Sequence, residues 1–485
     1  MWEYLCTRMK SNLNSEIIDC TDTKKVYTYA DVIELVNEYG TCLKSTIPKG
    51  SKCAILCESE FNQAISILAA WSANLIPIPM SSQYGSDHCK KIINLTRPDM
   101  LITDNEKNYE FADNISIYNS STLKCTQHFA TAQHDEGLCE CSLIMCTSGT
   151  TGVPKGAVIS KAGLINNIKA ICHYFDVSNK DTFLITRPLY HCAAMTGEFL
   201  TALVCGASIV FVKSAYAPQK IIEHIEQNKI TVMCSTPTLF RHLSLFAING
   251  RRALSLSKIA LSGECLSKES ACIIRKAFPT SKIYNVYGLT ECSPRVCYLE
   301  PTQFDLIPES VGVPVLGVEI KILDEHLNEL KYNEHGYIYV KSKSLMQGYY
   351  NNSELTHNVI IDGWLKTGDI GYKDEKGYLY VLSRADDMIN KGGMNIYPSE
   401  IENKLMELEQ IKECLAYGYK KNDTESIGLY VVLDSRYSLM TLKDIKAIIS
   451  AALPRYLMPT QISIVDTLKK NASGKKIRKS HNVND

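Results

Sequence analysis

Residues 147–156 concentrate side chains that suit phosphate binding. They follow the apolar run Leu143-Ile144-Met145, which predicts a strand, and they read Thr147-Ser148-Gly149-Thr150-Thr151-Gly152-Val153-Pro154-Lys155-Gly156. Glycines let a backbone approach a ligand closely, and successive N–H groups and hydroxyls in such a turn form an anion-binding concavity. Lys155 adds a positive charge for a phosphate chain. A Walker A loop is excluded, because that motif needs Ser or Thr directly after Gly-Lys. The alternative, a solvated surface turn, is disfavoured by the full order of residues after a strand.

This stretch closely resembles the phosphate loop of the adenylate-forming superfamily, which includes acyl- and aryl-CoA synthetases, peptide-synthetase adenylation domains and firefly luciferase. The resemblance runs through seven ordered motifs from about residue 25 to 479, with departures at Ser383, where glycine is usual, and at Asn395. It implies an enzyme that uses ATP and Mg²⁺ to adenylate a small-molecule carboxylic acid. In this family pattern the loop from Thr147 to Lys155 binds the nucleotide.

The second motif is Tyr287-Gly288-Leu289-Thr290-Glu291. By resemblance, Tyr287 stacks on adenine, Thr290 contacts the α-phosphate, and Glu291 binds Mg²⁺ with Thr147 as a further metal ligand. Mg²⁺ prefers one or two carboxylates together with phosphate oxygens and water, which agrees with these roles. Acetyl-CoA synthetases carry a tryptophan at the position of Gly288 that blocks the acyl pocket. The glycine therefore implies an acid larger than acetate.

His191 ends the segment Arg187-Pro188-Leu189-Tyr190-His191. In the family pattern this histidine lies beside the acid's carboxylate and the α-phosphate, where a neutral imidazole can donate a hydrogen bond without burying a full charge. Peptide-synthetase adenylation domains carry an aspartate a little further on for the α-amino group, whereas Cys192-Ala193-Ala194-Met195 follows here. The resemblance therefore implies an acid with an apolar body, and not an α-amino acid.

Two shorter motifs and one arginine complete the implied nucleotide site. The loop Ser262-Gly263-Glu264-Cys265-Leu266 resembles the one that lines adenine and the acyl pocket, which assigns Gly263 and Glu264 to cofactor binding. Thr367-Gly368-Asp369 resembles the ribose site, where one carboxylate can accept bonds from both vicinal hydroxyls. Arg384 would support the ribose from the other side.

The last hundred residues carry the parts that the resemblance describes as moving. Asp386 matches the hinge, a position that absorbs a large backbone change without touching ligand. Lys391-Gly392-Gly393-Met394-Asn395 matches the loop that lines the pantetheine tunnel after rotation, with Gly393 assigned to cofactor binding. Asn395 stands where some CoA ligases have an arginine for the CoA 3′-phosphate. Asn471-Ala472-Ser473-Gly474-Lys475 matches the catalytic lysine motif, although Lys475 also lies in a basic tail whose ordinary interpretation is a solvated terminus.

The resemblance implies a reaction in two steps. Attack of the acid's oxygen on the α-phosphorus of ATP expels pyrophosphate and gives an acyl-adenylate. Negative charge accumulates on the α-phosphoryl oxygens in the transition state of this attack, and Mg²⁺, Lys475 and Thr290 would stabilise it. A thiol then attacks the acyl carbon, which requires Lys475 to leave. We expect an acid–CoA ligase. The alternatives are a stand-alone enzyme that loads the phosphopantetheine of a separate carrier protein, since no carrier domain follows Lys475, and a nucleotide-binding protein without catalysis. The joint presence of Lys155, Glu291, Asp369 and Lys475 disfavours the last.

The elements that must position these motifs alternate between strand and helix. Before the phosphate loop we expect strands at 52–57, 75–80 and 100–103 and helices at 60–73 and 86–95, followed by polar, irregular residues at 104–140. After it we expect strands at 208–212, 230–234, 259–262 and 283–286 and helices at 218–228, 237–246 and 268–278. This alternation predicts two doubly wound α/β subdomains with parallel sheets. Because ligands bind beyond the carboxyl ends of such strands, we place segments 147–156, 262–264 and 287–291 at those ends.

The pattern changes after about residue 311. Short strands at 318–323, 337–341 and 379–382 predict a small β-barrel or curled sheet. From 386 the order helix, two strands, helix and strand predicts a compact α+β unit. We therefore divide the chain into an N-terminal domain that binds ATP and acid, residues 1–384, and a small mobile C-terminal lid domain, residues 385–485.

Composition narrows the functional classes further. At 485 residues the chain exceeds what one core supports. Lys+Arg and Asp+Glu both number 52, which gives no electrostatic reason to expect nucleic acid or an anionic membrane as partner. Residues 1–8 show no signal-peptide pattern, and no apolar run approaches the ~18 residues of a membrane span. The 19 cysteines are scattered without a C-x-x-C pair, which favours reduced thiols. We expect a soluble cytoplasmic monomer or homodimer with no membrane insertion.

Overall fold

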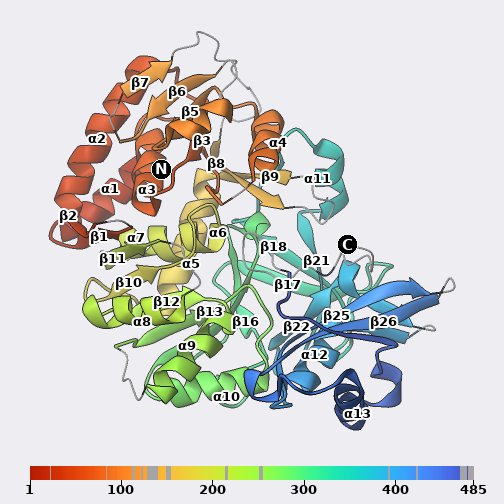
Figure 1. Cartoon of the computed structure of the whole chain (residues 1–485). Coiled ribbons are helices and arrows are strands. Elements are labelled where there is room, and N and C mark those ends of the chain that lie inside the picture. The colour runs from red at the N-terminus through yellow and green to blue at the C-terminus, as the bar shows by residue number, and fades with distance from the viewer. Residues whose placement is uncertain are drawn as a thin grey trace.

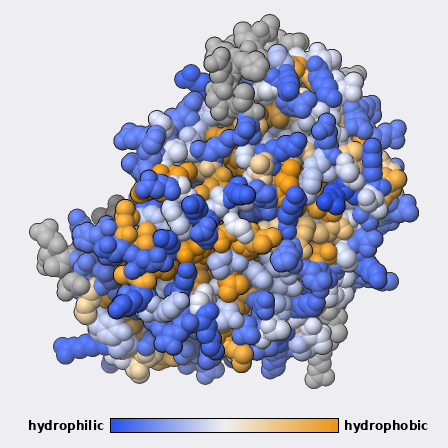
Figure 2. Space-filling model, turned by 180° about the vertical axis from the view of Figure 1, so that it is seen from behind, coloured by the Kyte–Doolittle hydropathy of each residue, from blue (hydrophilic) through white to orange (hydrophobic). Residues whose placement is uncertain are grey.

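The computed structural model describes most of the chain. The described residues are 1–21, 23–83, 85–111, 115–121, 124–127, 140–148, 154–213, 217–250, 255–391, 394–421, 424–469 and Arg478. None of the helices in these ranges is both long and apolar enough to cross a bilayer. Hydrophilic and apolar side chains are interspersed over the face seen from behind (Figure 2).

The largest sheet has nine strands and carries two of the predicted ligand segments at its carboxyl edge. Its order is β16-β15-β14-β13-β12-β10-β11-β1-β2. The six strands from β14 to β1 are parallel, and antiparallel strands close both edges. Helices α8, α9 and α10 cover one face (Figure 1). The bounds are β1 Glu16–Cys20, β2 Lys25–Thr28, β10 Thr182–Ile185, β11 Ser208–Val212, β12 Val232–Ser235, β13 Lys258–Leu261, β14 Lys282–Gly288, β15 Arg295–Tyr298, β16 Val313–Pro314, α8 Pro218–Gln227, α9 Pro237–Asn249 and α10 Lys268–Ala277.

The N-terminal sheet has five strands in the order β4-β3-β5-β6-β7. Residues 104–140 were expected to be irregular, and this prediction is wrong in part, because β6 extends the parallel sheet and β7 closes it as an antiparallel edge. The burial of Ile117 and Tyr118 against β5 holds β6, a contact that the local pattern does not reveal. The bounds are β3 Lys52–Leu56, β4 Ile76–Pro79, β5 Met100–Thr103, β6 Ser116–Asn119, β7 Lys124–Gln127, α1 Trp2–Met9, α2 Tyr29–Thr46, α3 Glu60–Ser72, α4 Ser86–Thr96 and the 3-10 helix η2 Glu106–Phe111.

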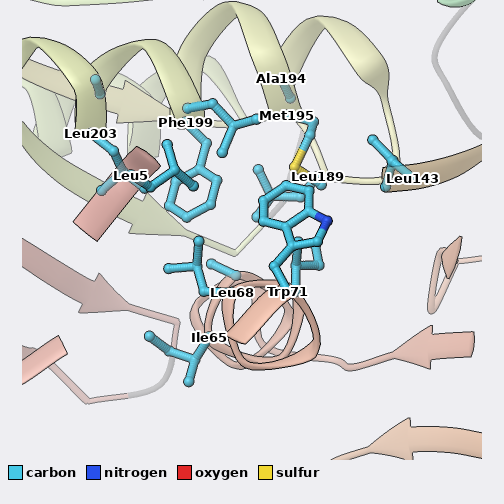
Figure 3. Close-up of a cluster of buried hydrophobic side chains, with 14 of the residues drawn as sticks. Leu5, Ile65, Leu68, Trp71, Leu143, Leu189, Ala194, Met195, Phe199 and Leu203 are labelled. Atoms are coloured by element: carbon cyan, nitrogen blue, oxygen red, sulfur yellow. The ribbon is translucent and has the colours of Figure 1, made fainter. Parts of the chain in front are cut away.

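A shared core joins these two sheets. Helix α3 packs beneath a continuous helical segment that consists of α6, the π-helix η4 and α7, and Trp71 and Leu68 face Met195 and Phe199 across this contact (Figure 3). Trp71 also donates a hydrogen bond through Nε1 to the carbonyl of Ser142, at 2.6 Å. The packing fixes the segment that follows His191. Its bounds are α6 Cys192–Ala194, η4 Met195–Leu200 and α7 Thr201–Cys205, with α5 Lys161–Phe175 alongside.

A β-hairpin and a curled sheet lie between the two large sheets and the C-terminal part. The hairpin pairs β8 with β9 in antiparallel register, and β19 adds to β9. The curled sheet pairs β17, β18, β21, β20 and β22 antiparallel, as predicted for this region. The bounds are β8 Cys141–Ser148, β9 Pro154–Ser160, β17 Val318–Leu323, β18 Gly336–Ser342, β19 Gly348–Tyr349, α11 Ser353–Val359, β20 Ile360–Ile361, β21 Trp364–Lys373 and β22 Leu379–Arg384.

The C-terminal residues form an α+β unit with a core of their own, which begins at Ile389. It lies beside β22 (Figure 1), where Ser399 Oγ donates to the carbonyl of Leu382 at 2.6 Å. The predicted α/β fold class is confirmed, while the mobility of this unit stays a prediction. The bounds are η6 Ala385–Asp387, β23 Ile389–Lys391, β24 Met394–Ile396, α12 Pro398–Met406, β25 Ile411–Lys421, β26 Thr424–Leu433, η7 Ser435–Tyr437, α13 Leu442–Ala452, η8 Arg455–Leu457 and β27 Gln461–Ile464.

Candidate active site

The residues predicted for adenine and ribose come together at the end of β14. The hydroxyl of Tyr287 donates a hydrogen bond to Oδ2 of Asp369, which lies in β21. Arg384 is the register partner of Asp369 across β21 and β22, and its Nη1 donates to Asp369 Oδ1 at 3.0 Å. Burial, and then the Asp369 carboxylate, raise the pKa of the Tyr287 phenol, so that it stays a donor. Both Asp369 oxygens thus already accept hydrogen bonds, and a ribose would share or replace these donors.

The carboxylate predicted to bind the metal, that of Glu291, lies in the single helical turn that follows β14. Glu291 belongs to the 3-10 helix η5, Thr290–Cys292, and its Oε1 accepts a 2.7 Å hydrogen bond from the hydroxyl of Tyr349. The Lys155 ammonium lies 5.6 Å from the centre of the same tyrosine ring. Because β19 pairs with β9, Tyr349 links the carboxylate predicted to bind metal to the strand that follows the predicted phosphate loop. Sequence reasoning missed Tyr349, whose short strand has no periodic signal.

The segment predicted to bind phosphate is flanked by two strands, β8 and β9, that pair with each other. Thr147 and Lys155 are register partners in β8 and β9, and Thr147 Oγ1 lies 3.5 Å from the Lys155 carbonyl oxygen. The prediction that this loop follows the carboxyl end of a parallel strand is therefore wrong, because β8 is antiparallel to β9. Gly149, Thr150, Thr151 and the side chain of Ser148 lie outside the described residues.

The loop after β13 is positioned as predicted, at the carboxyl end of a parallel strand. Gly263 has φ +93, a left-handed conformation that favours glycine. Glu264 Oε2 accepts from the hydroxyl of Thr238 at 2.6 Å and from its N–H at 3.3 Å. Glu264 therefore binds the first turn of α9. The backbone also requires Gly288, where an added Cβ would lie 2.2 Å from the carbonyl oxygen of Pro294.

His191 precedes α6 directly, at the N-cap position of that helix. Its ring lies 4.0 Å from the ring of Tyr190, measured between centroids. The segment before it is tied to α3, since the Leu189 N–H donates to Oε2 of Glu60 at 2.9 Å. Burial raises the pKa of Glu60 to about 7. A titratable group thus holds the loop that ends in the predicted acid-binding histidine.

We expect the Glu60→Gln variant to gain stability relative to the parent protein as the pH rises from 4.5 to about 7. The quantity that grows over this interval is the difference between their free energies of unfolding. Over this interval the folded state binds more protons at Glu60 than the unfolded state, so stability falls as pH rises. Glutamine cannot ionise and keeps an oxygen for the Leu189 N–H. Melting temperatures below, within and above the interval measure the effect, with the exposed Glu58→Gln as control. A difference between variant and parent that does not change with pH would contradict it.

A second group of charged side chains, not predicted, lies buried or partly buried beside the segment after His191. Arg187 donates from Nε and Nη2 to Oε1 of Glu198, at 2.9 and 2.6 Å, and from Nη1 to the Ser262 hydroxyl at 2.8 Å. Arg295, at the start of β15, is 1% exposed. The one available signal was Glu198, a single acid within an otherwise apolar stretch.

The remaining predicted site residues lie outside the described part of the chain: Gly393 and Lys475. Arg478 is described, and it anchors the chain near its end to the C-terminal unit, with Nη2 donating to Glu402 Oε2 at 3.0 Å and Nε 3.5 Å from Asp387 Oδ2. No group of three metal-ligating side chains occurs among the residues that the structure describes.

The model of the AMP-binding enzyme family matches residues 9–350, and the model of the AMP-binding enzyme C-terminal domain matches residues 400–475. The chain belongs to the AMP-binding enzyme family. This confirms the resemblance found in the sequence motifs. A 2-succinylbenzoate–CoA ligase of Bacillus pumilus is 28% identical over 459 residues, which cover 93% of this chain and 92% of that protein. A feruloyl-CoA synthase of Amycolatopsis is 28% identical over 340 residues, or 70% of this chain and 69% of that protein.

Solved structures agree with the fold of this AMP-binding enzyme. The o-succinylbenzoate CoA synthetase of Bacillus subtilis, in complex with its acyl-adenylate intermediate, superposes with a TM-score of 0.86 at 24% identity, covering 99% of this chain and 98% of that one. The predicted enzyme class, a ligase that forms carbon–sulfur bonds, is confirmed by the ligases among its relatives.

Proposed function

We propose that this AMP-binding enzyme adenylates a carboxylic acid larger than acetate, and not an α-amino acid, with ATP and then transfers the acyl group to the thiol of CoA. The observation that carries the proposal is the convergence at one end of β14 of five residues from four strands and the helix η5: Tyr287, Glu291, Asp369, Arg384 and Lys155. The CoA ligases among the relatives favour CoA as the acceptor.

The site residues suit a nucleotide triphosphate with Mg²⁺. Glu291 offers a carboxylate that accepts a hydrogen bond from the neutral phenol of Tyr349, and Thr147 offers a hydroxyl from the neighbouring hairpin. These two would hold the metal, which needs few protein ligands when phosphate oxygens and water complete its shell. When bound, Mg²⁺ would neutralise charge on the phosphates. Lys155 and Thr290 would orient the phosphate chain, Tyr287 and Asp369 would bind the nucleoside, and His191 would orient the acid.

We also propose the division of labour between residues 1–384 and 385–485. Its support is that the C-terminal unit has a separate core and that η6, with the predicted hinge Asp386, joins it to β22. Rotation about this hinge would bring Lys475 to the acid and ATP for the first step. It would then bring the loop with Gly393 to the thiol for the second.

Acid-dependent exchange of labelled pyrophosphate into ATP tests the first step, with a panel of acids at fixed ATP and Mg²⁺. We expect exchange with at least one acid larger than acetate. Exchange with no acid would overturn adenylation and favour a nucleotide-binding protein without catalysis. Thioester formation with free CoA, compared with a holo-carrier protein, tests the second step. A thioester formed only on the carrier would replace CoA with the phosphopantetheine of a separate carrier protein.

A further inference from the structure

Arg295 is the largest side chain among those less than 2% exposed. Its backbone is fixed, because its N–H donates to Asn167 Oδ1 at 3.0 Å and its carbonyl accepts from Asn167 Nδ2 at 2.9 Å. Its Nε and Nη2, however, have no hydrogen-bond partner within the described residues. A buried cation without hydrogen-bond acceptors is costly, so the free nitrogens require an explanation.

The guanidinium lies against the helix that begins after His191. An added Cβ at Gly197 would lie 2.8 Å from Arg295 Nη2, so the absence of a side chain at this glycine leaves room for the arginine. Gly197 belongs to the π-helix η4, and π-bulges are frequent at functional sites. Gly197 follows His191 by six residues along the same helical segment. Arg295 also lies close to Glu291 in the sequence, because the short connection between β14 and β15 contains Glu291 and ends at Arg295.

The charges around Arg295 do not balance. Arg187 and Arg295 carry two positive charges, and Glu198, which is 0% exposed, carries one negative charge. Glu198 Oε1 accepts both bonds from Arg187, while its Oε2 has no partner among the described residues. Burial raises the pKa of Glu198 and Arg187 lowers it, and protonation of Glu198 would only increase the positive excess.

The other groups near Arg295 do not supply the missing negative charge. The Glu291 carboxylate also lies in this neighbourhood, where it acts on Cys192 together with Arg295, but the proposed function assigns its charge to Mg²⁺. The Tyr174 hydroxyl is also buried without a partner in the described part of the chain. Burial raises its pKa to about 12, although the charge of Arg295 and, to a smaller extent, a side-chain contact with Arg295 oppose the shift. A neutral phenol brings no negative charge to the arginine. Burial likewise raises the pKa of Cys192 to about 12 and that of Cys234 above its ordinary value. The cluster therefore presents one unpaired cation, with neutral hydroxyl and thiol groups around it.

We propose that Arg295 is a specificity-determining residue that binds a second carboxylate of the acid substrate, so that this enzyme activates a dicarboxylic acid at one of its two ends. The inference rests on the proposed function, because it assigns the far end of the same acid. Nε and Nη2 form one side of a guanidinium and can bind a carboxylate with two parallel hydrogen bonds. Arg187 uses the same two nitrogens toward Glu198. The second carboxylate would complete the charge balance of the cluster.

Matched acids in the pyrophosphate exchange assay test this proposal. The pairs are hexanoate with hexanedioate and octanoate with octanedioate, each measured as kcat/KM. We expect the diacid to exceed its monoacid by at least ~10-fold, as a charge-assisted hydrogen bond contributes roughly this much. A preference for the monoacids would overturn the proposal while leaving acid adenylation intact. Exchange with none of the acids would overturn both.

Arg295→Met is the decisive variant, since it keeps an unbranched side chain and removes the unpaired charge, leaving Arg187 and Glu198 balanced. We expect it to reverse the preference toward the monoacids. Gly197→Ala provides a second variant that retains the arginine but crowds Nη2, and we expect it to lower kcat/KM for the diacids selectively. An unchanged ratio of diacid to monoacid in either folded variant would show that Arg295 serves structure alone.

Discussion

Glu291→Gln is expected to lower the rate of acid-dependent pyrophosphate exchange by about 10²–10³-fold, the usual loss when one preorganised stabilising group is removed. Glutamine preserves the volume and an oxygen that can accept the hydrogen bond from Tyr349. It removes the negative charge that Mg²⁺ requires of its protein ligand. Exchange measured at saturating acid and ATP isolates this loss from any change in substrate affinity.

Tyr349→Phe is the matched control for that variant. It removes the hydroxyl that donates to Glu291 but keeps the carboxylate and the aromatic ring beside Lys155. The net contribution of such a hydrogen bond corresponds to about 2- to 10-fold. If the two variants lost activity equally, the role of Glu291 would be to hold Tyr349, and the assignment of the carboxylate to the metal would be wrong.

The parts of the fold that could be predicted are those whose signal is local. Parallel strands such as β3, β5 and β13 are short apolar runs between amphipathic helices, and their bounds follow from that alternation. The strand β6 was missed, because its four residues are held by a partner strand rather than by their own pattern. The hairpin around the phosphate loop was also missed, since an apolar strand before a glycine-rich turn fits either a parallel or an antiparallel partner.

In the candidate site, too, the residues with a local sequence signal could be predicted, and the contacts between distant segments could not. Tyr287, Asp369 and Arg384 could be predicted from motifs. The structure joins Tyr287 to Asp369 across 82 residues and Arg384 to Asp369 across 15, each by a hydrogen bond. Their mutual bonding is a property of packing, which no motif contains. Arg295 shows most clearly what sequence alone cannot predict. Its proposed role depends on contacts with Gly197 and Glu198, which lie almost a hundred positions earlier in the chain. In the sequence it is only a charged residue after a proline.

Lys475→Ala is expected to abolish adenylation while sparing thioester formation from supplied acyl-adenylate. In the first step the lysine would stabilise negative charge on the α-phosphoryl oxygens, so its removal is expected to cost at least ~10²–10³-fold in pyrophosphate exchange. In the second step the bond to the phosphate breaks, and the thiol needs the space that the lysine would otherwise occupy. Each half-reaction is measured separately, the second with synthetic acyl-adenylate and CoA.

The exposed Lys469, which also lies in the basic C-terminal segment, offers the control for charge alone. Lys469→Ala should retain both half-reactions, because a solvated lysine contributes little to a buried transition state. Equal loss of both half-reactions in Lys475→Ala would contradict the two-conformation account, since a residue that leaves before the second step cannot be needed for it. If the Lys475→Ala variant retained both half-reactions, Lys475 would be a solvated lysine of the basic tail without a catalytic role. Residues of the N-terminal domain alone would then have to stabilise the charge on the α-phosphate.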